Sequence, residues 1–134
     1  MIVIVAGTIG RSGLGGQAWA GMQYLLGLQA LGHEVYYLED CGRSSWAYIW
    51  ETCEWTHELD YPAAFVESCL TPVGFGDRWI YRDNYRSLGM PLASFLEVCA
   101  GAELYPPDQN QAAASKATNA GKSLMFFMAV SPVS

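Results

Sequence analysis

The fold is decided by residues 2–40, which read IVIVAGTIGRSGLGGQAWAGMQYLLGLQALGHEVYYLED. The stretch opens with five apolar residues, mostly β-branched, which is typical of a central strand buried on both faces of a parallel sheet. Residues 17–31 then carry large apolar side chains at helical spacing, and Gly32 stands where helices commonly end. Residues 34–40 predict a second strand that ends in two acids. Together these segments predict a βαβ unit.

The segment between the first strand and the helix, GTIGRSGLGG at residues 7–16, contains five glycines in ten residues. Glycine permits tight turns and lets a ligand approach bare backbone, and the helix start behind it offers free N–H groups to an anion or a sugar hydroxyl. We therefore take Gly13, Gly15 and Gly16 as candidate substrate-binding residues. The spacing does not fit the dinucleotide fingerprint Gly-x-Gly-x-x-Gly, and a purely structural strand-to-helix connection remains the alternative.

The two acids that end the second strand, Glu39 and Asp40, lie about 24 residues beyond the Gly15-Gly16 pair. In dinucleotide-binding folds an acid in a comparable position hydrogen-bonds the ribose diol. Both residues are therefore candidate substrate-binding residues as well. The alternative is that they only terminate the strand.

The next sixty residues carry weaker patterns. Residues 41–61 crowd aromatic side chains without a clean period and predict a short helix followed by a loop over the sheet edge. Apolar spacing predicts a helix at 63–70, a short strand at 79–81 and a further helix at 91–100. His57 stands among acids, so it is a candidate acid/base residue, with a surface histidine beside acids as the alternative.

Composition excludes several classes of function. The chain has 134 residues, of which 51% are hydrophobic and 15% charged, and its formal net charge is -6. These values fit a single globular domain, and an acidic chain without a basic cluster is a poor partner for nucleic acid. No apolar run reaches the roughly 18 residues that span a bilayer, and no basic region precedes the first strand. We therefore expect no membrane span, no signal peptide and a cytoplasmic protein.

The four cysteines form no Cys-x-x-Cys pair, and the sequence has only two histidines. No zinc-ligand spacing follows from this set, so we predict no metal site. We expect four free thiols in a reducing compartment.

The last thirty residues differ in composition from the rest. Residues 1–104 contain 5 basic and 12 acidic side chains, whereas residues 105–134 contain 2 and 1. We divide the chain accordingly into a Rossmann-like domain at 1–104 and a tail at 105–134, which is either disordered or adds one strand. The apolar run at 123–130 is the strand candidate. A half-sheet with an open edge also predicts a homodimer, through edge pairing or through this run.

The predicted fold class is therefore α/β, a Rossmann-like three-layer parallel sheet that is partial or truncated, with a variable C-terminal tail. The run from Gly15-Gly16 to Leu31-Gly32-His33-Glu34-Val35 resembles the opening of bacterial GT-B-type glycosyltransferase-like proteins. In that group a Gly-Gly loop precedes a helix that ends in Leu-Gly-His-x-Val. The resemblance is close over residues 1–42 and continues to about residue 100.

The resemblance implies an acceptor-side half of a glycosyltransferase. GT-B enzymes have two Rossmann-like domains, and the nucleotide-sugar donor sits mostly on the C-terminal one. We expect this chain to correspond to the N-terminal domain of a truncated enzyme and to be catalytically incomplete alone. We predict no cofactor; a nucleotide-sugar donor is implied by the resemblance alone. Its catalytic residues stay unknown. The alternative is a stand-alone module that binds a nucleotide or another small ligand, or that oligomerises, without catalysis.

Overall fold

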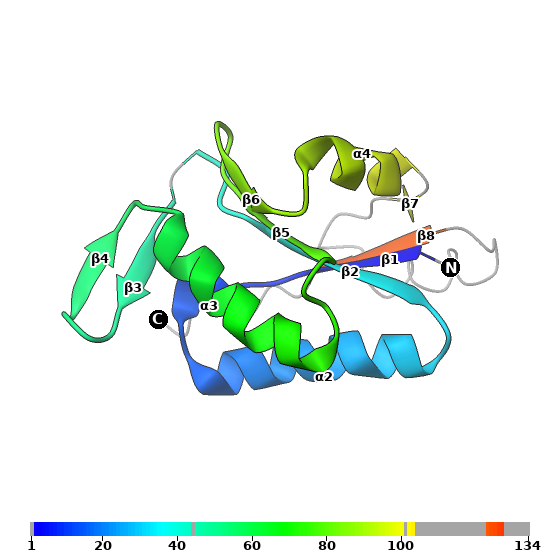
Figure 1. The fold of residues 1–134 in the computed structure, drawn as a ribbon, viewed down its shortest axis with the longest axis horizontal. Helices are drawn as coiled ribbons and strands as arrows, with labels where there is room; N and C mark the ends of the chain where they lie inside the picture. Colours follow the sequence, from blue (N-terminus) through cyan, green and yellow to red (C-terminus); the bar gives the residue numbers. More distant parts are fainter. Residues whose placement is uncertain (1, 44, 101, 104–122, 128–134) are drawn as a thin grey trace.

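The computed structural model describes residues 2–43, 45–100, 102–103 and 123–127 (Figure 1). A short 3-10 helix, Thr71–Val73, links the third helix to the strand that follows. The elements are β1 (Ile2–Ala6), α1 (Ile9–Ser12), α2 (Gly15–Ala30), β2 (Glu34–Asp40), β3 (Ala47–Ile49), β4 (Glu54–Thr56), α3 (Asp60–Leu70), β5 (Trp79–Arg82), β6 (Ser87–Gly89), α4 (Leu92–Ala100), β7 (Ala102–Glu103) and β8 (Ser123–Phe127).

The main sheet has the strand order β6-β5-β2-β1-β8-β7. All neighbouring strands run parallel except β5 and β6, which are antiparallel. The sheet is therefore mixed and mostly parallel, and the expectation of an all-parallel sheet was wrong at this edge. The cause is local: Asp83 Oδ1 accepts hydrogen bonds from the backbone N–H groups of Tyr85 (2.8 Å) and Arg86 (2.7 Å), and this turn brings β6 back beside β5.

Helices cover the sheet from both sides (Figure 1), with α2 and α3 on one face and α4 on the other. Side chains alternate along each strand, so Val3 and Val5 face the first pair of helices while Ile4 faces α4. Val3, Ile4 and Val5 are all buried, which confirms the prediction of a strand buried on both faces. Burial of each such side chain contributes about 2 kcal/mol.

The predicted first strand, first long helix and second strand are confirmed, and α2 begins two residues earlier than expected. The later helices and the strand at 79–81 are confirmed as α3, α4 and β5, with α3 starting at Asp60. The glycine segment was predicted as a loop, but it contains the helical turn α1. This difference matters for the candidate site described below.

The prediction for residues 41–61 was wrong. Instead of a helix and a loop, this part of the chain holds the antiparallel hairpin β3–β4, which pairs Ala47 with Thr56 and Tyr48 with Trp55. Ala47 is fully buried, and β3 contacts α1 and α3. One face of the hairpin is buried against two helices, and the other carries aromatic residues. Buried and exposed positions therefore alternate with a period of two, which the many aromatic residues obscured in the sequence.

Part of the predicted tail belongs to the sheet. β8 lies between β1 and β7 and pairs with both in parallel, as the added-strand alternative expected. β1 pairs with Leu124–Phe127 on one edge of β8, and β7 pairs with Ser123 and Leu124 on the other. The two outer strands, β6 and β7, have three and two residues, and such short edges recruit further strands poorly. The domain boundary at residue 104, and the rest of the tail at 105–122 and 128–134, lie outside the described residues.

Candidate functional site

The glycine segment begins where β1 ends. Gly7 donates its N–H to the carbonyl of Leu38 in β2 (3.1 Å), and the chain then turns into α1. A Cβ on Gly10 would lie 2.6 Å from the Pro62 carbonyl oxygen, so only glycine lets α1 pack this closely on α3. Gly13 then ends α1 in the left-handed conformation with φ of 60°. These two glycines are required by the local backbone and packing.

Glu39 at the end of β2 lies inside the protein, with 2% of its surface exposed. Its Oε2 accepts hydrogen bonds from the Gly10 N–H (2.9 Å) and the Tyr37 hydroxyl (2.9 Å), and its Oε1 accepts one from the Arg11 N–H (2.7 Å). The carboxylate therefore caps the start of α1 from a neighbouring strand, where a negative charge also suits the helix dipole.

Burial controls the titration of Glu39. Loss of hydration raises the pKa of its carboxyl to about 7, although the hydrogen bonds from Gly10, Arg11 and Tyr37 act in the opposite direction. Burial also raises the pKa of Tyr37, whose hydroxyl accepts a hydrogen bond from the Ile9 N–H at 3.0 Å. Tyr37 therefore links β2 to α1 as a neutral phenol that donates to one group and accepts from another.

Asp40, the second predicted acid, has a different environment. Consecutive residues of a strand point to opposite faces, and Asp40 is exposed where Glu39 is buried. Its Oδ1 accepts the N–H of Gly42 (2.8 Å), and its Oδ2 lies 3.6 Å from Nε of Arg82. The structure thus separates the two candidate acids, and only Asp40 is accessible from solvent.

The start of α2 is open to solvent. Gly15 and Gly16 are exposed, and a Cβ added to either would meet no atom within 4 Å. Leu14, the residue before the helix, is extended, and its side chain makes no capping hydrogen bond. The first N–H groups of a helix have no partner within the helix, so those of α2 are available to water or to a ligand.

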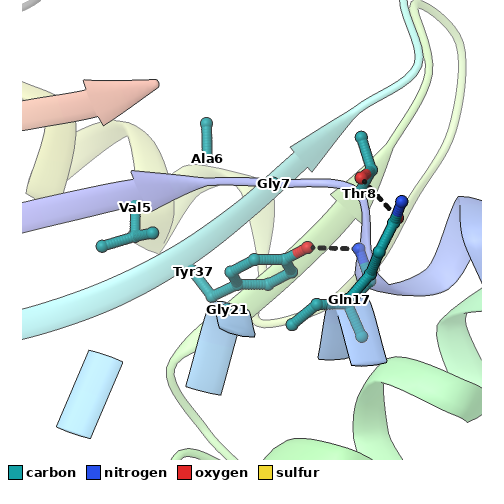
Figure 2. Close-up of a pocket in the computed structure, with 8 residues that line it drawn as sticks. Val5, Ala6, Gly7, Thr8, Gln17, Gly21 and Tyr37 are labelled. Carbon is teal, nitrogen blue, oxygen red and sulfur yellow. Dashed lines mark hydrogen bonds between the residues drawn. The ribbon is translucent and has the colours of Figure 1, made fainter. Parts of the chain in front are cut away.

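A small cavity of about 20 Å³ lies behind this helix start, and that is room for one water molecule. It is lined by the end of β1, by Tyr37, and by Gln17 and Gly21 of α2. Figure 2 shows the Tyr37 ring beneath the β1 end, with its hydroxyl directed at a backbone nitrogen, and the Gln17 amide beside Thr8. Gln17 Oε1 accepts hydrogen bonds from the hydroxyls of Thr8 (3.4 Å) and Ser12. These bonds fix the position of α2 relative to α1.

Sheet topology places this region at a favourable point for a ligand. From β1 the sheet grows through β2 to β5 on one side, whereas β8 lies on the other side of β1. The order therefore reverses between β1 and β8, at the edge that the glycine segment follows. In open α/β sheets, ligands bind outside the carboxyl ends of the strands at such a reversal.

The hairpin β3–β4 lies beside the same segment. The Trp50 indole N–H donates to the Ser12 carbonyl (3.1 Å), and its ring would be 3.3 Å from a Cβ on Gly13. Trp50 was not predicted as part of a site, because its contact with Ser12 joins residues 38 positions apart in the sequence. His57, the acid/base candidate, holds Nδ1 2.8 Å from the Ser45 carbonyl oxygen. Its ring centroid lies 3.8 Å from that of Trp46, with the two rings tilted by 57°.

The three candidate glycines, Gly13, Gly15 and Gly16, are neighbours in the sequence. Glu39 does not contact them; it binds the earlier part of the segment, at Gly10 and Arg11. Tyr37 and Gly10 were missed, because their roles depend on contacts between β2, α1 and α3. Cys41, Cys53, Cys69 and Cys99 are unpaired. Within the described residues, no group of three or more His, Cys, Asp or Glu side chains is placed to hold a metal ion.

Comparison of the chain with protein-family models, curated proteins and solved structures finds no match. None of the described helices is both long enough and apolar enough to cross a membrane.

Proposed function

We propose that the chain is a Rossmann-like ligand-binding domain, equivalent to the acceptor-side half of a GT-B-type glycosyltransferase-like protein. Its ligand is a small molecule that carries a phosphate or sugar hydroxyl group, and the binding site is the start of α2. The strand order around β1, the exposed glycine pair and the sequence resemblance over residues 1–42 support this proposal together.

The observation that carries the proposal is the unfilled surface at Gly15 and Gly16. Neither position needs glycine for packing, since a Cβ would meet nothing within 4 Å. Bare backbone at the N-terminus of a helix of 16 residues is suited to an anion, because free N–H groups and the helix dipole both attract it. A large or branched side chain there would hold the ligand away from those N–H groups.

The two acids at the end of β2 are not assigned to this ligand. Glu39 is engaged with the chain's own N–H groups. Asp40 points to the opposite face of the sheet, where its Oδ2 lies 3.6 Å from Nε of Arg82. Because the donor sits mostly on the other domain of GT-B enzymes, we expect the isolated chain to bind its ligand without transferring a sugar.

The test is calorimetric titration of the chain with glucose 1-phosphate, glucose and UDP, using two substitutions at one position. Gly15→Pro removes one N–H from the helix start; proline is accepted at this first helical position, and the extended Leu14 suits a following proline. Gly15→Ala keeps the N–H and serves as the matched control. We expect glucose 1-phosphate to bind, and Gly15→Pro to weaken it about tenfold or more through loss of a charge-assisted hydrogen bond.

Equal affinity of the proline and alanine variants would contradict the site. Strong UDP binding that is lost in Gly15→Pro would favour the alternative of a stand-alone nucleotide-binding module. If none of the three ligands binds to the folded chain, the proposed ligand class is wrong.

A further inference from the structure

The hairpin β3–β4 carries an uncovered aromatic face. Residues alternate between two sides of a strand, and Tyr48 lies directly opposite Trp55. One side of the hairpin packs against α1 and α3 through the fully buried Ala47. The opposite side, here called the aromatic face, consists of Trp46, Tyr48, Trp55 and His57. Trp50 borders this face and turns its indole N–H toward the Ser12 carbonyl at the end of α1.

Solvent reaches most of this face. Trp46, Trp50 and Trp55 expose 40%, 49% and 59% of their surface. Trp46 and Trp50 flank β3, Trp55 lies in β4, and ring contacts through Tyr48 join the three into a contiguous patch. Such patches on a protein surface mark sites of interaction. In Figure 1 the hairpin extends beyond the end of α3, so the main sheet does not cover it.

The rings of this face stand nearly perpendicular to one another. Tyr48 meets Trp50 at 74° and Trp55 at 69°, with ring centroids 4.6 Å and 5.2 Å apart, and Trp46 meets Trp55 at 78°. Ring faces therefore point in several directions rather than forming one flat platform. Each face of an aromatic ring carries partial negative charge and attracts a cation, tryptophan most strongly.

The charges of the hairpin have a single sign. Residues 45–60 contain four carboxylates, Glu51, Glu54, Glu58 and Asp60, and no lysine or arginine. The Tyr61 hydroxyl donates to Glu51 at 2.6 Å and lowers the pKa of that carboxyl, which keeps it ionised. One guanidinium already occupies the end of the hairpin: Arg86 donates to the His57 carbonyl at 3.2 Å and lies 4.0 Å from Glu58.

The geometry points to a docking surface for a basic peptide segment of a partner protein, with arginine or lysine side chains seated on the aromatic face and its acidic surroundings. Residues two apart on a strand lie about 7 Å from each other. An extended segment with basic residues two positions apart therefore matches Trp46 and Tyr48. A second copy of this chain is a poor occupant, because each copy has a net charge of -6.

The proposal does not depend on the ligand at α2, and it is tested with the intact chain. The probe is a fluorescent peptide in which arginine alternates with glycine, and binding is measured by anisotropy at low and at physiological salt. Trp55→Ala removes the most exposed indole of the face. Trp19→Ala is the matched control, since Trp19 on α2 is 57% exposed and lies outside the hairpin. Glu54→Gln removes a charge that neighbours Trp55 but points to the other side of the strand, so it tests attraction over a distance; its matched control is Glu67→Gln on α3.

We expect the peptide to bind, and Trp55→Ala to weaken binding about two- to fivefold, which is the loss of one exposed cation–π contact. Glu54→Gln should weaken binding more at low salt than at physiological salt. Both control variants should bind as the unsubstituted chain does, and circular dichroism should show that all four remain folded.

Three outcomes would overturn the inference. One is absence of peptide binding at low salt, and another is an equal loss in Trp55→Ala and Trp19→Ala. The third is quenching of tryptophan fluorescence by a neutral oligosaccharide such as maltohexaose, lost in Trp55→Ala, while the arginine peptide has no effect. That last result would assign the aromatic face to carbohydrate instead.

Discussion

Two helices begin within seven residues of each other in the glycine segment, and their starts are treated in opposite ways. The start of α1 is buried, and its Gly10 and Arg11 N–H groups are satisfied by Glu39 from β2. The start of α2 is exposed, and no side chain caps it. The segment therefore has an inner half completed by the protein itself and an outer half left open to solvent.

Space for a Cβ separates the structural glycines of this segment from the candidate ligand-binding ones. Gly10 has no room for a Cβ, whereas Gly15 has open space around it. Packing therefore requires glycine at position 10, whereas no contact requires it at position 15. The following four predictions, in order of decreasing size, test this contrast through stability.

The largest effect is the pH dependence contributed by Glu39. Burial raises the pKa of its carboxyl from 4.5 to about 7 in the folded chain. The folded state then binds more protons than the unfolded state between these values, so the free energy of unfolding falls as pH rises from about 4.5 to 7. The fall attributable to this group is about 3 kcal/mol. Urea denaturation across this range should show it for the unsubstituted chain.

Glu39→Gln provides the control for that prediction, because glutamine does not titrate. The difference in stability between the two proteins should change by about the same amount between pH 4.5 and 7. Parallel pH profiles would show that the Glu39 carboxyl is not the group responsible.

Gly10→Ala has the next largest effect. The added Cβ would lie 2.6 Å from the Pro62 carbonyl oxygen and 2.9 Å from Cγ2 of Val66, so α1 and α3 must move apart. We expect a loss of about 2 kcal/mol in the free energy of unfolding, measured by chemical denaturation at constant pH. An unchanged denaturation midpoint would mean that α1 is not packed this closely on α3.

Gly13→Ala should cost less. Here the obstacle is the backbone, since φ of 60° strains any residue with a Cβ, and the nearest contact is the flexible Trp50 ring at 3.3 Å. We expect a loss of about 1 kcal/mol. Gly13→Asn is the comparison, because asparagine tolerates this conformation better, and it should recover part of the loss. Equal stability of the two variants would argue against the left-handed turn.

Gly15→Ala should have the smallest effect and the opposite sign. Alanine restricts the unfolded chain and favours helix, and no atom lies within 4 Å of the new Cβ. We expect a gain of about 0.5 kcal/mol, visible as a small rise in the thermal midpoint. A loss comparable to that of Gly10→Ala would erase the contrast between the two helix starts and remove the main support for a ligand site at α2.

Much of the fold could be predicted because its signals are local. A run of five apolar residues predicts β1, and helical spacing that ends at a glycine predicts α2 and the start of β2 after it. These signals do not depend on the rest of the fold. The hairpin β3–β4 was missed because its aromatic side chains conceal an alternation of two, and the burial of Ala47 depends on α1 and α3, which come from other parts of the chain. The antiparallel β6 follows from the turn at Asp83, a signal of only a few residues.

The candidate site, too, has features that follow from local sequence and features that follow from contacts between distant segments. The glycine-rich segment between β1 and α2 and the two acids that end β2 could be read from residue order alone. Contacts between distant segments make Glu39 point inward to cap α1 and Asp40 point outward, and they leave no room for a Cβ at Gly10 but open space at Gly15. The physical reason is that a strand alternates its side chains between two faces, and the packing of α1, α2 and α3 determines which face is buried.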